Sequence, residues 1–305
     1  MSDLQLRLDD LQLDARHDLL DVHVSGRLLT GLAEVGFREQ LLGLAAELEL
    51  EPAVRFVLPR PGVARRRAAL LAAPAASAAQ VNEVLLGDPV EVLHDRDGFS
   101  LVRTMADDYL GWLRRELIVP GHYPVTHTVT ALRAHAYAGP RVQAERLADL
   151  SWGVQLQVRS RGGDWAHVLL PGGQDAFVHA RALVEGSPGP DTDFAASCTR
   201  LLHAPYIWGG NTAWGLDCSG LAQLVHAMAG AQLPRDADEQ FAAGTPVEPD
   251  EARPGDAACY TGHIGIITGP ETMIHATGRT MDVREDHIFA TQGLKEAFLG
   301  VVRFG

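Results

Sequence analysis

Apolar and polar positions in residues 1–62 predict a strand, then a helix, then a second strand. An apolar, partly alternating run at 19–24 favours the first strand, and the apolar run at 53–58 favours the second. Between them, leucine and alanine recur at helical spacing over 41–48. Two prolines and a glycine at 59–62 end regular structure. No residues in this segment indicate catalysis or binding, so we expect it to be an appendage that only packs against the rest of the protein.

Residues 63–187 contain no long helical period, only short β-rich runs broken by glycine, proline and charge. Two stretches, at 86–113 and 150–178, look alike: each has a Gly/Asp turn before an aromatic residue, with apolar runs on both sides. Short strands separated by turns are typical of a small closed barrel. A repeat of roughly 60 residues indicates two copies of one module. We therefore predict barrels over 63–122 and 123–187.

The last part of the chain, 188–305, follows a linker signal, Ser-Pro-Gly-Pro at 187–190. We predict a helix over 194–202, a Gly-Gly loop, a second helix from Cys218 and short strands from Ala257 onward. The second helix is predicted because apolar residues after Cys218 recur along one helical face. These residues are Leu221, Leu224, Val225 and Met228.

The amino-acid composition argues against some classes of function. The 305 residues are 46% hydrophobic and 21% charged, which is typical of a globular protein with real cores. The net charge is −13, whereas a nucleic-acid-binding protein normally has a basic surplus, so we expect no nucleic-acid partner. No stretch reaches the roughly 18 apolar residues of a membrane span, so we expect no membrane partner either.

The number of cysteines and the first ten residues indicate the cellular compartment of the protein. Three cysteines cannot make a disulfide scaffold and leave one thiol free in any pairing, which indicates a reducing compartment. Residues 1–10 are acidic and polar, without a basic region followed by an apolar one, so we expect no secretory leader. The sequence therefore predicts a cytoplasmic protein.

The residues best suited to catalysis cluster around Cys218, at the predicted start of a helix. Backbone N–H groups and the helix dipole favour negative charge there, so we expect a lowered thiol pKa and possible support for an oxyanion. His263 heads an apolar strand, and His275 lies twelve residues on, in what should be the next strand. If both imidazoles face the same side, Cys218, His263 and His275 can serve as nucleophile, base and orienting group.

Each of these residues has an alternative, structural interpretation, because single buried cysteines and strand histidines are most often packing residues. We interpret Cys198 and Cys259 in that way. No Cys-x-x-Cys pair exists, so the spacing argues against zinc, and we expect no metal and no cofactor. The histidines of the first half without clustered partners are expected at surface or satisfied positions: His17, His23, His94, His122, His127 and His135.

Several motifs carry a resemblance to known families. Both barrel stretches resemble bacterial SH3-type (SH3b) barrels, in which an aromatic residue after Gly-Asp and a late Gly-Trp are typical; the first keeps Gly-Trp at 111–112, and the second has Ala-Phe at 176–177. The last part of the chain resembles the NlpC/P60 cysteine peptidases. The motifs are Trp-Gly-Gly at 208–210, Asp-Cys-Ser-Gly at 217–220, Gly-His-Ile-Gly-Ile at 262–266 and Ile-His-Ala at 274–276.

This resemblance implies an α+β architecture: a papain-like catalytic domain over 188–305, preceded by the two small SH3-like β-barrels and the short N-terminal α/β segment. The fuller pattern resembles the γ-D-glutamyl-L-diamino acid endopeptidases, or dipeptidyl-peptidases VI, which share the stretches found here at 204–210 and 233–236. It implies a peptidoglycan-derived peptide with a free N-terminal L-Ala, cut between γ-linked D-Glu and the diamino acid, as in the recycling of imported muropeptides.

Such a substrate needs partners for its ammonium, its free carboxylate and the developing oxyanion. Asp217, beside the thiol, is a candidate for the ammonium. Ser219 and Arg235 are candidate donors for the D-Glu α-carboxylate, since the planar guanidinium suits a carboxylate. Tyr206 and a backbone N–H are candidates for the oxyanion.

The resemblance further implies that the first SH3-type module closes the site against longer, blocked peptides. By the same resemblance, Tyr109 and Asp88 are candidates for gripping the amine. The family tends to have glutamate at the position of Asp88, and often a serine at the position of Ala237.

Two other functions stay open. One is a broader peptidoglycan hydrolase acting on the intact wall, with the SH3-like modules binding the wall, although a net charge of −13 suits an anionic wall poorly. The other is a non-catalytic muropeptide-binding protein that has kept the fold, against which the intact Cys218, His263 and His275 argue.

Overall fold

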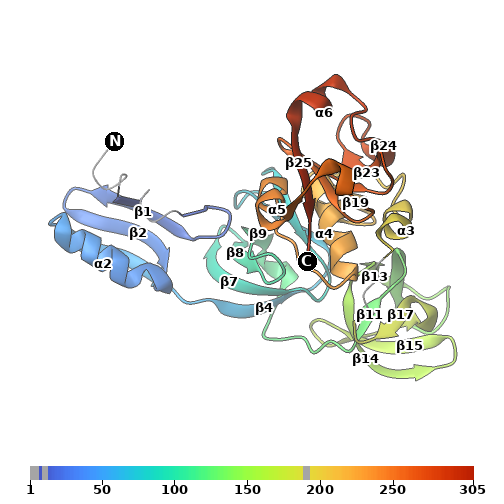
Figure 1. Ribbon diagram of the computed structural model, residues 1–305. Coiled ribbons are helices and arrows are strands. Elements are labelled where there is room, and N and C mark those ends of the chain that lie inside the picture. Colours follow the sequence, from blue (N-terminus) through green and yellow to red (C-terminus); the bar gives the residue numbers. More distant parts are fainter. Residues whose placement is uncertain (1–6, 9–12, 188–192) are drawn as a thin grey trace.

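The computed structural model describes residues 7–8, 13–187 and 193–305. Four units follow one another along the chain: an N-terminal unit that extends to one side, two all-β units, and a C-terminal unit of mixed helices and strands (Figure 1). The acidic start at 1–10 and the predicted linker at 187–190 lie largely outside the described residues. No helix among the residues described is long and apolar enough to cross a membrane.

The N-terminal unit is a three-stranded sheet with one helix packed on it. Its elements are β1 (Leu20–Ser25), β2 (Leu28–Glu34), the 3₁₀ turn η1 (Val35–Phe37), α2 (Arg38–Glu47) and β3 (Glu51–Val57). β1 and β2 are antiparallel, and β2 and β3 are parallel. The sequence predicted one strand before the helix, whereas the structure has a hairpin. Gly26, with φ of 64°, permits the tight turn that the apolar pattern did not reveal.

The first all-β unit is a seven-stranded sheet in the order β10-β4-β7-β8-β9-β5-β6. Its elements are β4 (Arg60–Ala64), β5 (Ala68–Leu71), β6 (Gln80–Val84), β7 (Pro89–Arg96), β8 (Phe99–Thr104), β9 (Leu110–Arg114), η2 (Arg115–Leu117) and β10 (Ile118–Pro120). The expected break at 59–62 is wrong in part, because Pro61 and Gly62 lie within β4. β10 pairs only with residues from Gly62 onward, so the missing N–H of Pro61 costs no ladder bond there.

The second all-β unit has the order β13-β12-β16-β15-β14-β11-β17. Its elements are β11 (His127–Val129), β12 (Arg133–Tyr137), β13 (Arg146–Ser151), β14 (Gln155–Gly162), β15 (Trp165–Leu170), β16 (Gln174–His179), η3 (Ala180–Ala182) and β17 (Leu183–Glu185). In both all-β units the first strand lies between the last and the fourth, and the second lies between the third and the sixth. The two units therefore share one strand topology.

The C-terminal unit is a six-stranded sheet in the order β20-β25-β21-β22-β23-β24, flanked by helices. Its elements are α3 (Phe194–Thr199), β18 (Asn211–Thr212), β19 (Gly215–Leu216), α4 (Cys218–Met228), α5 (Ala237–Ala243), β20 (Thr245–Val247), η4 (Pro249–Glu251), β21 (Ala257–Tyr260), β22 (His263–Ile267), β23 (Thr272–Thr277), β24 (Asp282–His287), α6 (Gln292–Ala297) and β25 (Phe298–Arg303). α4 packs on β22 and β23. The predicted helix start at Cys218 and the two histidines on neighbouring strands are confirmed.

The C-terminal unit contacts both all-β units. Trp152 of the second all-β unit is 1% exposed and belongs to the hydrophobic core of the C-terminal unit. From the first all-β unit, the Asn82 side-chain oxygen accepts a hydrogen bond from Arg235 Nε at 2.9 Å, and Asp107 accepts one from Gln223 at 3.1 Å. These contacts hold the first all-β unit beside the start of α4, where the site lies.

Candidate active site

A pocket of about 270 Å³ lies between the first all-β unit and the C-terminal unit. Tyr109 lines it from the first all-β unit, and Tyr206, Cys218 and Asp236 line it from the C-terminal unit. The pocket thus brings together residues that lie more than a hundred positions apart in the sequence.

Cys218 is the first residue of α4, and its local geometry follows from its neighbours. Asp217 caps the helix, with its carboxylate accepting the Gly220 N–H at 2.7 Å. The backbone N–H groups of Ser219 and Ile264 act to lower the pKa of the thiol. A Cβ at Gly220 would lie 2.1 Å from the Gly210 carbonyl oxygen, so only glycine lets the first turn of α4 pack on the preceding loop.

Two histidines and a carboxylate form a hydrogen-bonded chain on β22, β23 and β24. His263 Nε2 lies 2.7 Å from His275 Nδ1, and His275 Nε2 lies 3.3 Å from Asp286 Oδ2. A carboxylate only accepts, so His275 carries its proton on Nε2 and accepts at Nδ1 from His263 Nε2–H. Neutral His263 therefore keeps its lone pair on Nδ1, the nitrogen available as a base.

The electrostatics of this site correct one expectation. Burial raises the pKa of Cys218 to about 11, and the Asp217 carboxylate adds to that effect, although the N–H groups of Ser219 and Ile264 oppose it. Burial, with His275 nearby, lowers the pKa of His263 to about 4. The lowered thiol pKa expected from the helix terminus alone is therefore wrong, because burial outweighs it. The resting pair is a neutral thiol and a neutral imidazole.

The Asp217 carboxylate is already filled by protein donors. Arg235 donates to both of its oxygens, at 3.1 and 2.6 Å, and the Gly209 and Gly220 N–H groups and the Ser219 hydroxyl donate as well. A carboxylate offers about four acceptor sites. These bonds hold the carboxylate in place, but Asp217 also lines the pocket, so its predicted role at the substrate ammonium stays a prediction.

Arg235 is likewise committed to the protein. Its side chain is 1% exposed and donates to Asn82, Asp217 and the Ser219 hydroxyl oxygen. The predicted contact between Arg235 and a substrate carboxylate is therefore wrong. Ser219 does line the pocket, with its hydroxyl held between Asp217 and Arg235.

The two candidates from the first all-β unit have different outcomes. Tyr109 lines the pocket, and its hydroxyl donates to Asp236 Oδ2 at 3.3 Å. Asp88 lines a separate hollow and accepts the Leu85 N–H at 2.7 Å, which closes its own turn. Asp88 thus lies outside the pocket that contains Cys218, and its predicted role at the amine is corrected.

Comparison with known proteins identifies these units. The NlpC/P60 family pattern matches residues 203–303. The C-terminal unit is an NlpC/P60 domain. The pattern of the bacterial dipeptidyl-peptidase Sh3 domain matches residues 70–118, so the first all-β unit is a bacterial SH3 domain. Both family resemblances of the sequence are thereby confirmed for these two units.

Relatives of known name extend over more of the chain. The gamma-D-glutamyl-L-lysine dipeptidyl-peptidase of Bacillus cereus is 27% identical over 249 residues, which are 73% of this chain and 74% of that protein. The Bacillus subtilis protein of the same name is 26% identical over 189 residues, 57% of this chain and 63% of that protein, so the match spans less than two thirds of its length. A crystal structure of an NlpC/P60 family protein from Bacillus cereus, 21% identical, shares the fold with a TM-score of 0.72 over 80% of this chain and 99% of that one.

Sequence reasoning missed two carboxylates of this site in the NlpC/P60 domain. Asp286 lies two residues from Arg284, the cross-strand partner of His275, so it shares the face of β23 and β24 that carries His275. Asp236 directly follows Arg235 and faces the pocket. No local signal identifies Asp286, because only the pairing register of β24 places it beside His275.

The raised pKa of Cys218 predicts how its alkylation depends on pH. Below the thiol pKa, the thiolate fraction grows about tenfold per pH unit, so the rate with iodoacetamide should rise steeply from pH 7 to pH 10. Buried Cys198 and Cys259 should react far more slowly, since each is at most 1% exposed. Mass mapping of each cysteine over this pH range measures both rates. A rate that is already flat below pH 7 would show a preformed thiolate instead.

Proposed function

We propose that this protein is a cysteine peptidase that cleaves the γ-D-Glu–diamino acid bond of peptidoglycan-derived peptides with a free N-terminal L-Ala. The observation that carries this proposal is Cys218 at the start of α4, in a pocket walled by the SH3 domain, with the His263–His275–Asp286 chain on the adjoining strands. The relatives named gamma-D-glutamyl-L-lysine dipeptidyl-peptidase support this choice of substrate class.

The reaction follows from the proton positions. The Cys218 sulfur attacks the γ-carbonyl carbon while His263 Nδ1 takes the thiol proton, and His275 with Asp286 stabilises the imidazolium formed. Backbone N–H groups at the start of α4 and the Tyr206 hydroxyl are candidate donors to the oxyanion; burial raises the pKa of Tyr206 to about 12, so it keeps its proton. The C–N bond then breaks, and His263 returns the proton to the leaving amine. Water hydrolyses the thioester and releases L-Ala-D-Glu.

The substrate amine is assigned to the SH3-domain side of the pocket. Asp236 is the first candidate carboxylate there, with the Tyr109 hydroxyl oxygen beside it. Asp217, whose carboxylate pairs with Arg235, is a second candidate because it also lines the pocket. Ser219 is the candidate for the D-Glu carboxylate, because of the two predicted donors only Ser219 lines the pocket; its hydroxyl would turn from Asp217 Oδ1, 3.3 Å away, to donate to the substrate.

We assign the diamino acid to a second hollow of about 250 Å³. His263, His275 and Arg279 line it. The Arg279 side chain is 56% exposed. Its Nη2 lies 3.5 Å from Asp286 Oδ2, and the other donors of its guanidinium are available to a carboxylate of the leaving portion.

We place the reaction in the recycling of muropeptides in the cytoplasm. The three cysteines are unpaired thiols, which is the state expected in a reducing compartment. We take the second all-β unit as a further SH3-type module that supports the NlpC/P60 domain through Trp152.

Two synthetic peptides test the proposal: L-Ala-γ-D-Glu-meso-diaminopimelate and its N-acetylated twin. We expect mass spectrometry to show release of L-Ala-D-Glu from the free amine and cleavage of the acetylated peptide at least about 10²-fold slower. The physical reason is that the acetyl group removes the charge that Asp236 would hold and adds bulk against Tyr109.

The other outcomes discriminate between the alternatives. Equal cleavage of both peptides would indicate a broader peptidoglycan hydrolase and would contradict the amine role of Asp236. Cleavage of neither, with measurable binding of the free peptide, would indicate a muropeptide-binding protein. The Cys218→Ala variant serves as the blank for any contaminating peptidase.

A further inference from the structure

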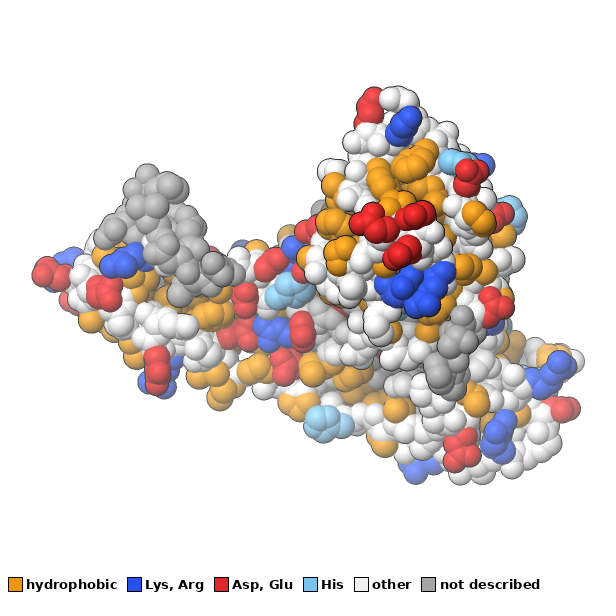
Figure 2. All heavy atoms as spheres, in the orientation of Figure 1, with side chains coloured by type: hydrophobic (Ala, Val, Ile, Leu, Met, Phe, Trp, Pro, Cys, Tyr) orange, Lys and Arg blue, Asp and Glu red, His pale blue; other side chains and the backbone are white. Residues whose placement is uncertain are grey.

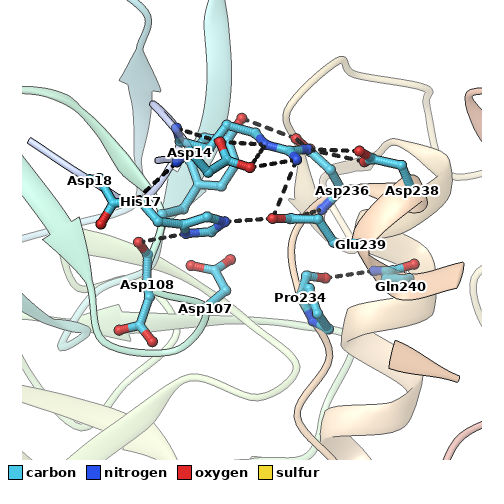
Figure 3. A network of polar contacts seen from close by, with 12 residues as sticks. Asp14, His17, Asp18, Asp107, Asp108, Pro234, Asp236, Asp238, Glu239 and Gln240 are labelled. Atoms are coloured by element: carbon cyan, nitrogen blue, oxygen red, sulfur yellow. Dashed lines mark hydrogen bonds and ion pairs between the residues drawn. The ribbon is translucent and has the colours of Figure 1, made fainter. Parts of the chain in front are cut away.

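Residues 13–18 of the N-terminal segment lie against the start of α5, beside the pocket. The Arg16 guanidinium is 3.0 Å from a carboxylate oxygen of Asp236 and 3.0 Å from one of Asp238, both of which line the pocket. Figure 3 shows Asp14 and His17 facing Asp236, Asp238 and Glu239 across the junction. The sequence predicted an appendage without chemistry here, and the structure shows that it supplies a cation to the wall of the pocket.

Most hydrogen-bond donors of the Arg16 guanidinium already have partners within the protein. Its Nε and Nη2 donate to Asp14 at 3.1 and 2.8 Å, and its Nη1 serves Asp236 and Asp238. Asp14, His17 and Glu239 also have the spacing of metal ligands, all within 4.8 Å. Because Arg16 and His17 already satisfy these carboxylates, the cluster is an ion-pair network.

His17 holds the segment at a second point. The prediction of a satisfied position is confirmed, and the expected lack of clustered partners is wrong. Its Nε2 is 2.5 Å from Glu239 Oε1, and its Nδ1 is 3.0 Å from the Asp108 carbonyl oxygen. Both partners only accept, so the ring must carry both protons to satisfy them. Burial lowers the pKa of His17, but these two hydrogen bonds outweigh that effect and raise it.

The backbone of the segment is held by the SH3 domain. The Leu110 N–H donates to the Arg16 carbonyl oxygen at 2.6 Å, and Arg103 donates to that of His17 at 2.7 Å. Arg103 also pairs with Glu34 of the N-terminal unit. In Figure 2 acidic, basic and histidine side chains gather where the N-terminal unit meets the body of the molecule. Three units therefore fix the position of Arg16.

We propose that Arg16 is a specificity-determining residue that closes the amine end of the pocket. This inference rests on the proposed function. Arg16 bridges Asp236 and Asp238 at the rim, so a peptide continuing beyond the amine must displace the guanidinium from charge-assisted hydrogen bonds. A peptide that ends at the amine leaves the bridge intact. Arg16 also offsets part of the negative charge of the two carboxylates.

The first test compares L-Ala-γ-D-Glu-meso-diaminopimelate with the same peptide extended by an N-terminal glycine. We expect Arg16→Ala to raise kcat/KM for the extended peptide, relative to the free one, by about tenfold or more. Arg16→Lys, which keeps the charge but cannot bridge as a fork, should give a smaller rise. Arg96→Ala is the control, since Arg96 is an exposed arginine of the SH3 domain and pairs with Asp97 outside this network. An unchanged ratio in Arg16→Ala would overturn the inference.

The second test does not depend on peptide cleavage. Cys218 is alkylated with cationic 2-bromoethylamine and with neutral iodoacetamide, and the two rates are compared by mass mapping. Removing Arg16 leaves Asp236 and Asp238 without their cation, so the ratio of cationic to neutral rates should rise about threefold or more in Arg16→Ala. If the wild type cleaves neither peptide, the proposed function fails, and the ratio of alkylation rates alone tests the role of Arg16. A higher ratio in Arg16→Ala supports that role in the pocket, and an unchanged ratio refutes it.

Discussion

Replacement of Cys218 by alanine is expected to abolish peptide cleavage, with a loss in kcat of about 10⁴-fold or more. The reason is that Cys218 is the only thiol among the pocket-lining residues that the structure describes. The neutral His263, on the strand β22 against which α4 packs, would then have no thiol to activate, and the helix terminus alone forms no covalent intermediate. Release of L-Ala-D-Glu from the free tripeptide, followed by mass spectrometry, measures the loss.

The other two cysteines provide matched controls for this substitution. Cys198 in α3 and Cys259 in β21 are fully buried, and neither lines the pocket. Cys198→Ala and Cys259→Ala should keep kcat within about threefold of the wild type. If Cys218→Ala retained wild-type activity, the assignment of the nucleophile, and with it the proposed mechanism, would be wrong.

Loss of the Arg235 side chain is expected to destabilise the NlpC/P60 domain by about 3–5 kcal/mol, because it leaves a buried carboxylate without its partner. Arg235→Ala removes both ion-pair hydrogen bonds to Asp217, which caps α4. It also breaks the bond from Arg235 to Asn82, which joins the SH3 domain to the NlpC/P60 domain. The urea midpoint of unfolding should fall accordingly.

Substitution of the exposed Arg96 is again the control, here for the stability of Arg235→Ala. Arg96 pairs with Asp97 where both side chains are more than half exposed, so Arg96→Ala should leave the midpoint almost unchanged. Arg235→Lys should recover only part of the loss, because an ammonium cannot reproduce the two parallel bonds to Asp217. A midpoint for Arg235→Ala equal to that of Arg96→Ala would mean that the Asp217–Arg235 pair contributes little.

The predictions that held concern local features of the chain. Helical spacing after Cys218 predicted α4 from its first residue, and the apolar runs around His263 and His275 predicted adjacent strands. Glycine-rich motifs at 208–210 and 217–220 carried the NlpC/P60 resemblance, which the family match confirms. Such signals are readable because helix and strand periodicity depends on residues only a few positions apart.

The predictions that failed concern partners from distant parts of the chain. Arg235 looked available to a substrate, but its buried guanidinium pairs with Asp217 across 18 positions. Asp88 looked close to the amine, but the turn that it closes faces a different hollow. The pKa of Cys218 followed burial by neighbouring elements, which outweighs the local effect of the helix terminus.

The sequence by itself therefore determined the kinds of the two units that the family patterns match, the start of α4 and the adjacent strands that carry His263 and His275, because each is encoded by local pattern. Only the tertiary structure decided which charged side chains pair within the protein and which face the pocket. The strand register places Asp286 behind His275, and docking of the N-terminal segment places Arg16 on Asp236. Register and docking depend on the summed packing of whole surfaces, and no short stretch of sequence contains that information.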